Sequence, residues 1–346
     1  MSVSVLVILA FVVAFLTAFA STPWARELAH IIGAIDDPKD AGKIHKTPIP
    51  RLGGIAIFFG FLIAVICFVV LTPEIIGIVA GSVIIVIMGA FDDRKPMRAI
   101  TKLLIQIVAA LIVALSGVRI EIFTNPILFF DNDYLVLGQL SIPLTVIWIV
   151  AITNAVNLID GLDGLAAGVA SISSICMLTI ALMVSESNIA ILTACIAGAC
   201  VGFLPYNFNP ASIFMGDSGS NFLGFLLACI SIEGLFKGYA VISFAVPLLL
   251  LALPIFDTSV AILRRIKNKK PVMAPDRGHL HHKLVDMGFS QKQAVLILYT
   301  ITAVLGLSAI ILTGFGALRA ILLLAGALFA MLISIYFFKE RNNKND

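Results

Sequence analysis

The chain consists of long apolar runs, each about as long as a helix that crosses a lipid bilayer, separated by short polar segments. A spanning α-helix needs about 20 mostly apolar residues. Hydrophobic residues make up 60% of the chain and charged residues only 12%, whereas a soluble domain has roughly 45–50% and 25%. No soluble core of this size could bury so much apolar surface, and a disordered chain has the opposite bias. The sequence therefore predicts an all-α polytopic membrane protein.

We expect about eleven membrane-spanning helices, which form a single integral membrane domain over residues 1–346. The expected ranges are 2–21, 53–71, 74–91, 101–117, 142–158, 165–184, 189–205, 219–236, 239–263, 293–313 and 316–338. The first range has an alternative interpretation as a signal peptide, because Ala18-Phe19-Ala20 resembles a cleavage site. However, no Lys or Arg precedes Arg26, and the apolar run is long for a signal. We therefore interpret this range as a span.

Basic residues are distributed very unevenly between alternate loops. The loops at 22–52, 92–102, 159–164, 206–218 and 264–292, together with the C-terminal tail, hold all of the 23 Lys and Arg residues except Arg119, Lys237 and Arg319. Because Lys and Arg concentrate on the cytoplasmic side, this distribution predicts an N-terminus outside and a C-terminus in the cytoplasm. On the outer side, residues 118–141 alternate around turn residues, which predicts a small extracytoplasmic β-hairpin.

Four polar motifs fall on the predicted cytoplasmic face. They are the segment 91–95, which contains Asp92-Asp93; the series Asn154, Asn157, Asp160 and Asp163; the segment 207–221, which contains Asn207, Asn209, Gly216-Asp217-Ser218-Gly219 and Asn221; and the segment 275–283, which contains Arg277-Gly278-His279-Leu280-His281-His282. The second motif repeats every three residues, so its side chains are neighbours on a helix and should face the bundle interior or a wet cleft. The simpler alternatives are helix caps, solvated helix ends and a surface loop in which histidines happen to cluster.

The residue types in these motifs favour phosphate chemistry. Carboxylates and amides select a hard cation such as Mg²⁺, which usually works with phosphates that a substrate supplies. The histidine cluster has no Cys or Glu at zinc-ligand spacing beside it, so we interpret it as an anion-binding loop with Arg277. A phosphate on a lipid would lie at this membrane face. The combination predicts a phosphotransferase that joins a soluble nucleotide to a lipid phosphate.

A transporter is the alternative class, because carboxylates within a membrane often mark ion paths. Asp257, in the ninth expected span, is the feature most like a transporter site. However, a transporter would place its polar groups near the midplane and usually show paired repeats. Pro247 and Pro254 in the same span predict a bend, which would open a groove for a lipid chain. Asp257 would then hold the inner half of this helix or merely cap it.

The motifs in this order resemble those of the polyprenyl-phosphate N-acetylhexosamine-1-phosphate transferases. The match runs from the segment Lys46-Thr47-Pro48-Ile49-Pro50-Arg51 to about Tyr299. The resemblance implies transfer of a sugar-1-phosphate from a UDP-sugar to a polyprenyl phosphate with release of UMP. It also implies Mg²⁺ as cofactor, with Mn²⁺ as an alternative, a location in the bacterial cytoplasmic membrane with the active site at the cytoplasmic face, and a homodimer. Nucleic acid is not an expected partner.

The resemblance also suggests roles for individual residues. The expected catalytic residues are Asp92, Asp93, Asp160 and Asp163, and the expected Mg²⁺ ligands are Asp217, Asn157 and Asp163. Expected substrate-binding residues are Lys46, Lys102, Asn154, Asn207, Arg277, His279, His281 and His282. Asp92 or Asp93 would take or orient the proton of the lipid phosphate, and a two-step route through an aspartyl-phosphate is the alternative.

The donor is inferred from the histidine loop. The peptidoglycan branch of the family, which uses UDP-MurNAc-pentapeptide, typically carries three consecutive histidines, whereas this chain has His279-Leu280-His281-His282. This pattern and the basic segment 264–270 resemble the UDP-GlcNAc branch, which makes 264–292 the expected donor-recognition loop. We therefore expect UDP-GlcNAc and undecaprenyl phosphate as substrates, in the first membrane step of an envelope polymer such as teichoic acid or O-antigen.

Overall fold

The computed structural model describes residues 1–38, 47–124, 134–236, 244–269, 271 and 278–326 of the chain. The described α-helices are α1 (Val3–Ile32), α2 (Gly53–Phe68), α3 (Pro73–Arg94), α4 (Ala99–Leu115), α5 (Ser141–Ile159), α6 (Leu165–Met183), α7 (Ser187–Asn207), α8 (Gly216–Ile230), α9 (Ala245–Leu250), α10 (Ala252–Lys267), α11 (Leu280–Asp286) and α12 (Gln291–Phe315). The 3₁₀ turn η1 (Gly138–Leu140) precedes α5, and the π-helical turn η2 (Ser231–Phe236) follows α8.

The described helices confirm a multi-pass membrane protein. Six of them are long and apolar enough to cross a membrane, namely α1, α3, α5 with η1, α6, α7 and α12. Shorter apolar helices are α2, α4 and Ala317–Gly326. The first helix is longer than expected, and only its first two thirds correspond to the range 2–21. The count of eleven spans and the orientation remain predictions. Residues 239–243 of the ninth expected span and 327–338 of the last lie outside the described residues.

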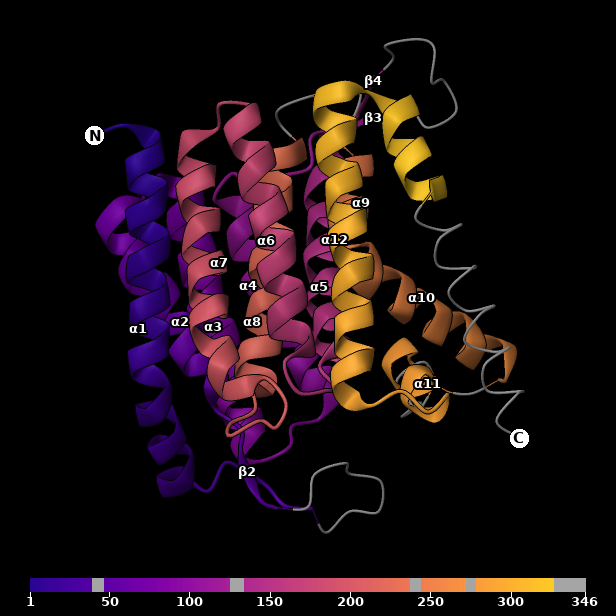
Figure 1. Ribbon diagram of the computed structural model, residues 1–346. Coiled ribbons are helices and arrows are strands. Elements are labelled where there is room, and N and C mark those ends of the chain that lie inside the picture. Colours follow the sequence, from indigo (N-terminus) through magenta and orange to yellow (C-terminus); the bar gives the residue numbers. More distant parts are fainter. Residues whose placement is uncertain (39–46, 125–133, 237–243, 270, 272–277, 327–346) are drawn as a thin grey trace.

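The helices stand side by side in a bundle, and different parts of the chain lie at the two ends of this bundle (Figure 1). The N-terminus and the strands β3 (Ile122–Thr124) and β4 (Tyr134–Val136) lie at one end, whereas β2 (Ile49–Pro50) and α11 lie at the other. Strands β3 and β4 pair antiparallel, with Ile122 opposite Val136, which confirms the expected hairpin. A second pair, β1 (Ile35–Asp36) with β2, was not expected from the sequence because each strand has only two residues.

Small residues let the helix backbones approach closely. A Cβ atom on Gly54 in α2 would lie 2.0 Å from the backbone nitrogen of Gly219 in α8, and one on Gly198 in α7 would lie 2.2 Å from the carbonyl oxygen of Phe11 in α1. Such approaches allow the van der Waals packing that holds membrane helices together. The first contact also brings α2 against the start of α8, where the polar motif begins.

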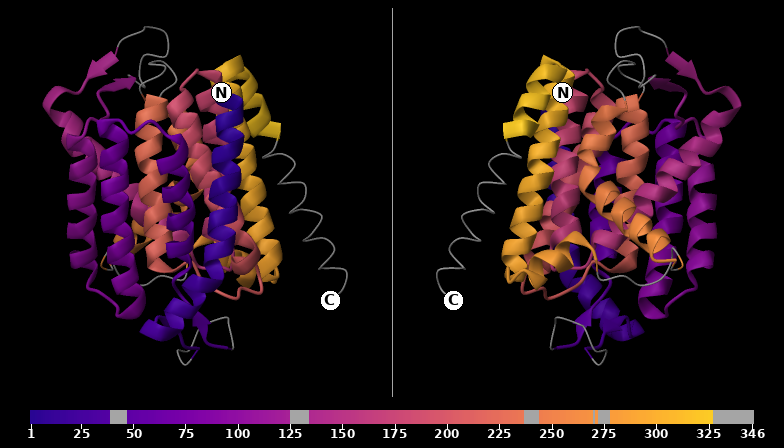
Figure 2. Two further views of the ribbon diagram at one scale, coloured as in Figure 1. Left: turned by 90° about the vertical axis from the view of Figure 1, so that its left-hand side faces the viewer. Right: turned by 90° about the vertical axis from the view of Figure 1, so that its right-hand side faces the viewer.

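The ninth expected span is divided into two helices at Leu251, which has non-helical backbone angles of φ −111° and ψ 14°. Pro254 has no N–H, so it cannot donate to the carbonyl of Leu250 four residues earlier. The hydroxyl of Ser173 in α6 donates to this carbonyl instead, at 2.8 Å. Beyond the break, α10 runs obliquely to the other helices (Figure 2). The predicted bend is confirmed, and a lipid groove beside it remains a prediction.

Candidate functional site

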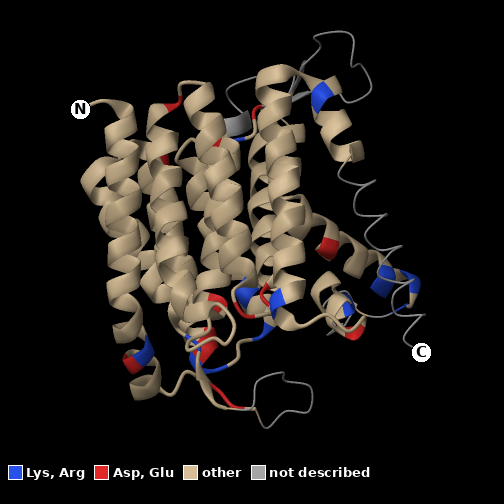
Figure 3. Cartoon of the chain, in the orientation of Figure 1, with Lys and Arg blue, Asp and Glu red and all other residues tan. Residues whose placement is uncertain are grey.

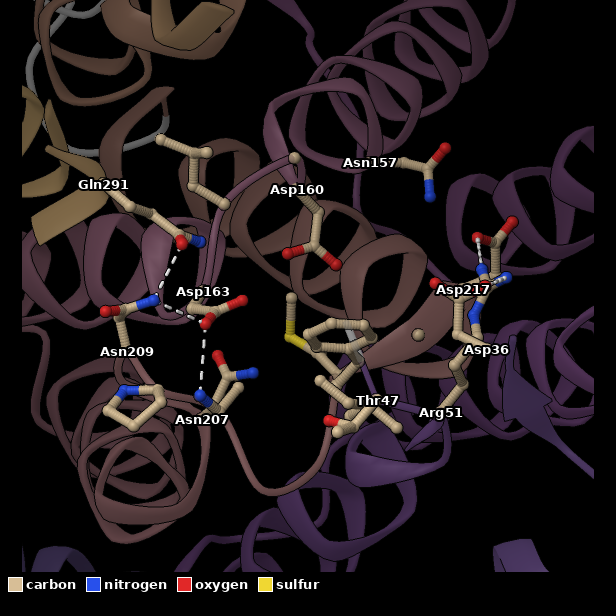
Figure 4. Close-up of a pocket in the computed structure, with 18 of the residues that line it drawn as sticks. Asp36, Thr47, Arg51, Asn157, Asp160, Asp163, Asn207, Asn209, Asp217 and Gln291 are labelled. Atoms are coloured by element: carbon tan, nitrogen blue, oxygen red, sulfur yellow. Dashed lines mark hydrogen bonds and ion pairs between the residues drawn. The ribbon is translucent and has the colours of Figure 1, made fainter. Parts of the chain in front are cut away.

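Charged residues gather at the end of the bundle that carries β2 and α11 (Figure 3). A cavity of about 780 Å³ opens there. Its walls come from the segment around β1 and β2, the turn after α5, the loop between α7 and α8, and the start of α12 (Figure 4). Polar residues that line it are Asp36, Thr47, Arg51, Asn157, Asp160, Asp163, Asn207, Asn209, Asp217, His282 and Gln291.

Asp217, in the first turn of α8, lies between two cations. Lys102 Nζ donates a hydrogen bond of 2.9 Å to Asp217 Oδ2, and Arg51 Nη2 lies 3.8 Å from Asp217 Oδ1. Arg51 also approaches Asp36 and Asp93, at 3.6 Å and 3.8 Å. A carboxylate at the start of a helix also benefits from the positive end of the helix dipole. The ionised form of Asp217 is therefore stabilised at the cavity wall.

The neighbouring residues Asp92 and Asp93 have different hydrogen-bond partners. Asp93 is buried, and its Oδ1 and Oδ2 accept hydrogen bonds from the backbone nitrogens of Asp217 at 2.7 Å and Ser218 at 3.0 Å. It therefore anchors the first turn of α8 from α3. Asp92 accepts from the backbone nitrogen of Met97 at 2.7 Å and from Lys102 Nζ at 3.2 Å. Neither carboxylate is among the residues that line the cavity.

Gly216 makes this arrangement sterically possible. Its φ of +70° is disfavoured for residues with a side chain. A Cβ atom there would lie 2.4 Å from both the carbonyl oxygen of Arg51 and Asp93 Oδ2. The glycine before Asp217 is therefore required for α3, β2 and α8 to meet.

A buried amide network supports the cavity from inside the bundle. Gln106 Nε2 donates to Asn221 Oδ1 at 3.0 Å, and Asn154 Nδ2 donates to Gln106 Oε1 at 2.7 Å. Asn221 Nδ2 in turn donates to the carbonyl oxygen of Asp217 at 2.8 Å. Asn154 therefore belongs to a chain of side chains behind Asp217 and does not line the cavity. A satisfied buried network of this kind fixes the positions of the helices that contribute to it.

The polar series at the end of α5 spreads over the cavity wall. Asn157 Nδ2 donates to Ser220 Oγ at 2.8 Å. Asp163 Oδ2 accepts from Asn209 Nδ2 at 2.9 Å and from the backbone nitrogen of Ala211 at 3.1 Å. Asp160 lies between the groups around Asp163 and Asp217 (Figure 4). The series thus contributes separate oxygen atoms to one cavity, and Asp163 also ties the turn after α5 to the loop before α8.

Asp160 has an altered acidity because of its surroundings. Burial, together with the negative charges of Asp217, Asp93 and Asp163, raises the pKa of its carboxyl to about 7, against the opposing effect of Arg51. Among the described residues that line the cavity, four are aspartates (Asp36, Asp160, Asp163 and Asp217) and one is an arginine (Arg51). A group with a pKa near neutrality changes its protonation state under physiological conditions.

Asn207 lines the cavity, but its amide holds the loops around it. Its Oδ1 accepts from the backbone nitrogen of Gly164 at 3.1 Å, and its Nδ2 donates to the carbonyl oxygen of Ile213 at 3.0 Å. The neighbouring Asn209 donates to Gln291 Oε1 at 2.7 Å, which connects the same loop to the start of α12. Both asparagines therefore shape the wall that carries Asp163.

The three histidines form a row that ends at the cavity. The rings of His279 and His281 are nearly parallel, with centroids 5.8 Å apart, and those of His281 and His282 are 4.2 Å apart. His282 lines the cavity, whereas His279 and His281 are buried behind it. Burial and the neighbouring His282 lower the pKa of His281 to about 4, so this ring is neutral at physiological pH. Lys46 and Arg277 lie outside the described residues.

The structure adds residues to which the sequence analysis gave no role at the site. Arg51, Gln106, Asn209, Asn221 and Gln291 all contact an expected site residue or line the cavity. Gln106 had a signal in the sequence, because a lone amide within an apolar span usually faces a polar site. Arg51, Asn209 and Asn221 stand within segments that the sequence analysis names, but nothing in those segments assigned them a role, and Gln291 gave no signal.

The donor set of the cavity fits a hard divalent cation. It consists of oxygen atoms from Asp160, Asp163, Asp217 and Asn157, and a cation would balance the excess of buried carboxylates. Within the described part of the chain, no three His, Cys, Asp or Glu residues stand close enough to hold a metal ion alone. Mg²⁺ usually takes one or two carboxylates together with substrate phosphates and water.

Comparisons with known proteins place this site in a family. Residues 75–235 match the model of Glycosyl transferase family 4. The chain is 41% identical over 307 residues to the probable undecaprenyl-phosphate N-acetylglucosaminyl 1-phosphate transferase of Bacillus subtilis (strain 168), covering 88% of this chain and 85% of that protein. It is 35% identical over 316 residues to a decaprenyl-phosphate N-acetylglucosaminephosphotransferase of Mycobacterium tuberculosis, covering 83% and 77%.

A more distant relative covers nearly the same part of the chain. The undecaprenyl-phosphate alpha-N-acetylglucosaminyl 1-phosphate transferase of Escherichia coli (strain K12) is 27% identical over 289 residues, covering 82% of this chain and 77% of that protein. The similarity to these relatives thus extends over more than four fifths of the chain. The chain belongs to the polyprenyl-phosphate N-acetylhexosamine-1-phosphate transferase family and is a membrane-bound glycosyl-1-phosphate transferase.

Proposed function

We propose that this enzyme transfers N-acetylglucosamine-1-phosphate from UDP-GlcNAc to undecaprenyl phosphate and releases UMP. The observation that carries the proposal is the cavity at the charged end of the bundle, where Asp217 is held by Lys102 and Arg51 beside Asp160 and Asn157. The names of the relatives above support the lipid phosphate acceptor and the GlcNAc-1-phosphate group.

The reaction breaks one phosphoanhydride bond and forms another. A phosphate oxygen of the lipid forms a bond to the β-phosphorus of UDP-GlcNAc, and the bond from that phosphorus to the oxygen bridging to the α-phosphate breaks. UMP leaves with that oxygen, and the product is undecaprenyl-diphosphate-GlcNAc. Because such a reaction requires positioning and charge neutralisation above all, the protein's cations and its fixed carboxylates are the groups that matter.

We further propose Mg²⁺ as the cofactor, which Asp217, Asn157 and Asp163 would hold. When bound, the ion would neutralise charge on the phosphates of the donor. Asp93 acts in this scheme through α8, because both of its oxygens hold the backbone of the first turn in place. Lys102 keeps Asp217 and Asp92 together, so the carboxylate that faces the cavity has a fixed direction.

The proton of the lipid phosphate needs little help at neutral pH, since a phosphate monoester with a second pKa near 6 is already mostly dianionic. Asp92 and Asp93 remain proposed bases for acid conditions, although both are engaged in hydrogen bonds with backbone nitrogens. Asp160 is a further proposed base, because it faces the cavity and its pKa of about 7 suits proton exchange. A route through an aspartyl-phosphate is the less favoured alternative.

For the donor side, we propose that His282 and the loop 264–292 bind the UDP-sugar. The row of histidines supplies directional nitrogen atoms next to the turn that carries Asp160 and Asp163. Arg277 would add a bidentate contact to phosphate. The alternative donor is UDP-MurNAc-pentapeptide. A transport function is disfavoured because the charged residues gather at one end of the bundle (Figure 3), where the cavity opens.

The remaining part of the proposal concerns location. We propose that the cavity faces the cytoplasm, that the N-terminus is outside, that the protein resides in the bacterial cytoplasmic membrane as a homodimer, and that its product starts an envelope polymer such as teichoic acid or O-antigen. A purified enzyme offered undecaprenyl phosphate and a panel of UDP-sugars tests the donor. UDP-GlcNAc should be used best, and preferential use of UDP-MurNAc-pentapeptide would contradict the assignment.

A further inference from the structure

Asp257 and His279 form a buried pair outside the cavity. His279 Nδ1 lies 2.8 Å from Asp257 Oδ2, and each residue has 4% of its surface exposed. The other oxygen of Asp257 accepts a hydrogen bond of 2.8 Å from the backbone nitrogen of Leu280, the first residue of α11. One carboxylate on α10 therefore holds both the ring of His279 and the start of the helix that carries the other two histidines.

The pair determines which ring nitrogen of His279 carries hydrogen. An ionised carboxylate can only accept hydrogen bonds, so Nδ1 of His279 must be the donor. In the neutral ring Nε2 is then the acceptor nitrogen, with its direction set by the carboxylate. A cap at the start of α11 would need only the hydrogen bond from Leu280. The second hydrogen bond, to a buried histidine, therefore does more than cap this helix.

A continuous series of contacts leads from this pair to the cavity. The ring of His279 lies parallel to that of His281, at 8° and a centroid distance of 5.8 Å. His281 packs against the turn after α5 so closely that a Cβ atom on Gly161 would lie 2.2 Å from His281 Nε2. His282, 4.2 Å from His281 between ring centroids, lines the cavity, as does Gly161 itself.

We propose that Asp257 is a positioning residue for the donor. By fixing His279 and the start of α11, it sets the place of His282 and of the turn Gly161–Asp163 that together form one wall of the cavity. This inference rests on the proposed function, in which that wall receives a UDP-sugar. The positioning role also explains the break in the ninth span, since the oblique path of α10 brings Asp257 to the histidine row.

Asp257→Asn separates positioning of His279 from capping of α11. An asparagine keeps an oxygen for Leu280, but its NH₂ group faces His279 Nδ1, which favours the opposite ring tautomer. We expect the Kd for UDP-GlcNAc, measured by calorimetry on the purified enzyme, to rise at least about tenfold, as for loss of a charged hydrogen bond. The KM for undecaprenyl phosphate should change less than about twofold, because the lost interaction concerns the other substrate. Asp286→Asn, at an exposed position of the same helix, is the matched control and should bind like the wild type.

A double variant shows whether Asp257 acts through His279. If it does, Asp257→Asn should weaken binding much less in a His279→Ala background than in the wild type, because the two substitutions remove the same interaction. Equal Kd values for the wild type and Asp257→Asn, or fully additive effects, would overturn the positioning role. Calorimetry with UDP alone distinguishes failure of the positioning role from failure of the proposal that UDP-GlcNAc is the donor. A wild type that binds UDP but not UDP-GlcNAc contradicts the proposed donor, and the same comparison of variants is then read with UDP.

Discussion

Lys102 Nζ donates a 2.9 Å hydrogen bond to Asp217 Oδ2 across 115 residues of sequence, and the same ammonium group lies 3.2 Å from Asp92 Oδ2. Arg51 approaches the other oxygen of Asp217. Helix α4 and the residue that follows β2 thus meet at one carboxylate of α8, which is held in place before any substrate arrives. Preorganised charges of this kind require no rearrangement during the reaction.

Replacing Lys102 by methionine should lower kcat/KM by roughly 10²–10³-fold, the usual cost of one preorganised electrostatic contact. The substitution leaves Asp92 and Asp217 without their shared cation. Steady-state kinetics with UDP-GlcNAc and undecaprenyl phosphate give the measurement. Lys95→Met, at an exposed position after α3, is the matched control and should retain normal kinetics. Equal losses in both variants would show that the bridge has no special role.

Asp217→Asn should abolish turnover and weaken the dependence on Mg²⁺. The amide keeps the shape of the side chain but lacks the charge that a divalent cation requires. Activity is measured against Mg²⁺ concentration after treatment with a chelator. Glu186→Gln, at an exposed position before α7, controls for loss of charge alone. Normal activity with an unchanged Mg²⁺ response in Asp217→Asn would rule out this residue as a ligand.

The raised pKa of Asp160 predicts a pH-dependent affinity for Mg²⁺. With a pKa of about 7, its carboxyl is protonated below neutrality and ionised above it. The ionised form adds negative charge to the cavity, so cation binding should be tight at pH 8 and weaken by up to about tenfold per pH unit below 7. Mg²⁺ titrations between pH 5.5 and 8 measure this slope. Asp160→Asn should bind more weakly at pH 8 and show a flatter profile, and an unchanged slope would assign the titration to another group.

The broken helix predicts a thermodynamic coupling between Ser173 and Pro254. Ser173→Ala leaves the buried Leu250 carbonyl without its donor and should lower the free energy of unfolding by about 1–3 kcal/mol. Adding Pro254→Ala supplies an N–H four residues after Leu250, so the double variant should lose less than Ser173→Ala. Thermal unfolding in detergent compares them. Thr179→Ala, whose hydroxyl donates to Ile175 of its own helix, is the control. Purely additive losses would contradict the coupling.

Much of this architecture follows from patterns in the sequence. The apolar runs predict most helices, because the length of a span is set by the bilayer. The prolines predict the break in the ninth span, since each removes a backbone donor. Alternation around turn residues predicts the β3–β4 hairpin, which the structure confirms. Strands β1 and β2 have two residues each and leave no periodicity to detect.

The sequence predicts which residues gather at the site better than it predicts how their side chains pair. The motifs name the residues that gather at one end, including Asp160, Asp217 and His282. Spacing alone does not show that Asp93 turns both of its oxygens toward the backbone of α8, because this depends on how α3 packs against a helix more than 120 residues away. Nor does it reveal the pairing of Asp257 with His279, which depends on the oblique course of α10 after the break.

The most direct test of the central claim follows the two phosphorus atoms of the donor. Purified enzyme is given undecaprenyl phosphate, Mg²⁺ and UDP-GlcNAc labelled with ³²P at either the α- or the β-phosphate. Transfer of GlcNAc-1-phosphate predicts that the β label enters the lipid and that the α label leaves as UMP. Release of both labels together as UDP, with an unlabelled lipid product, would mean transfer of the sugar alone and would contradict the account.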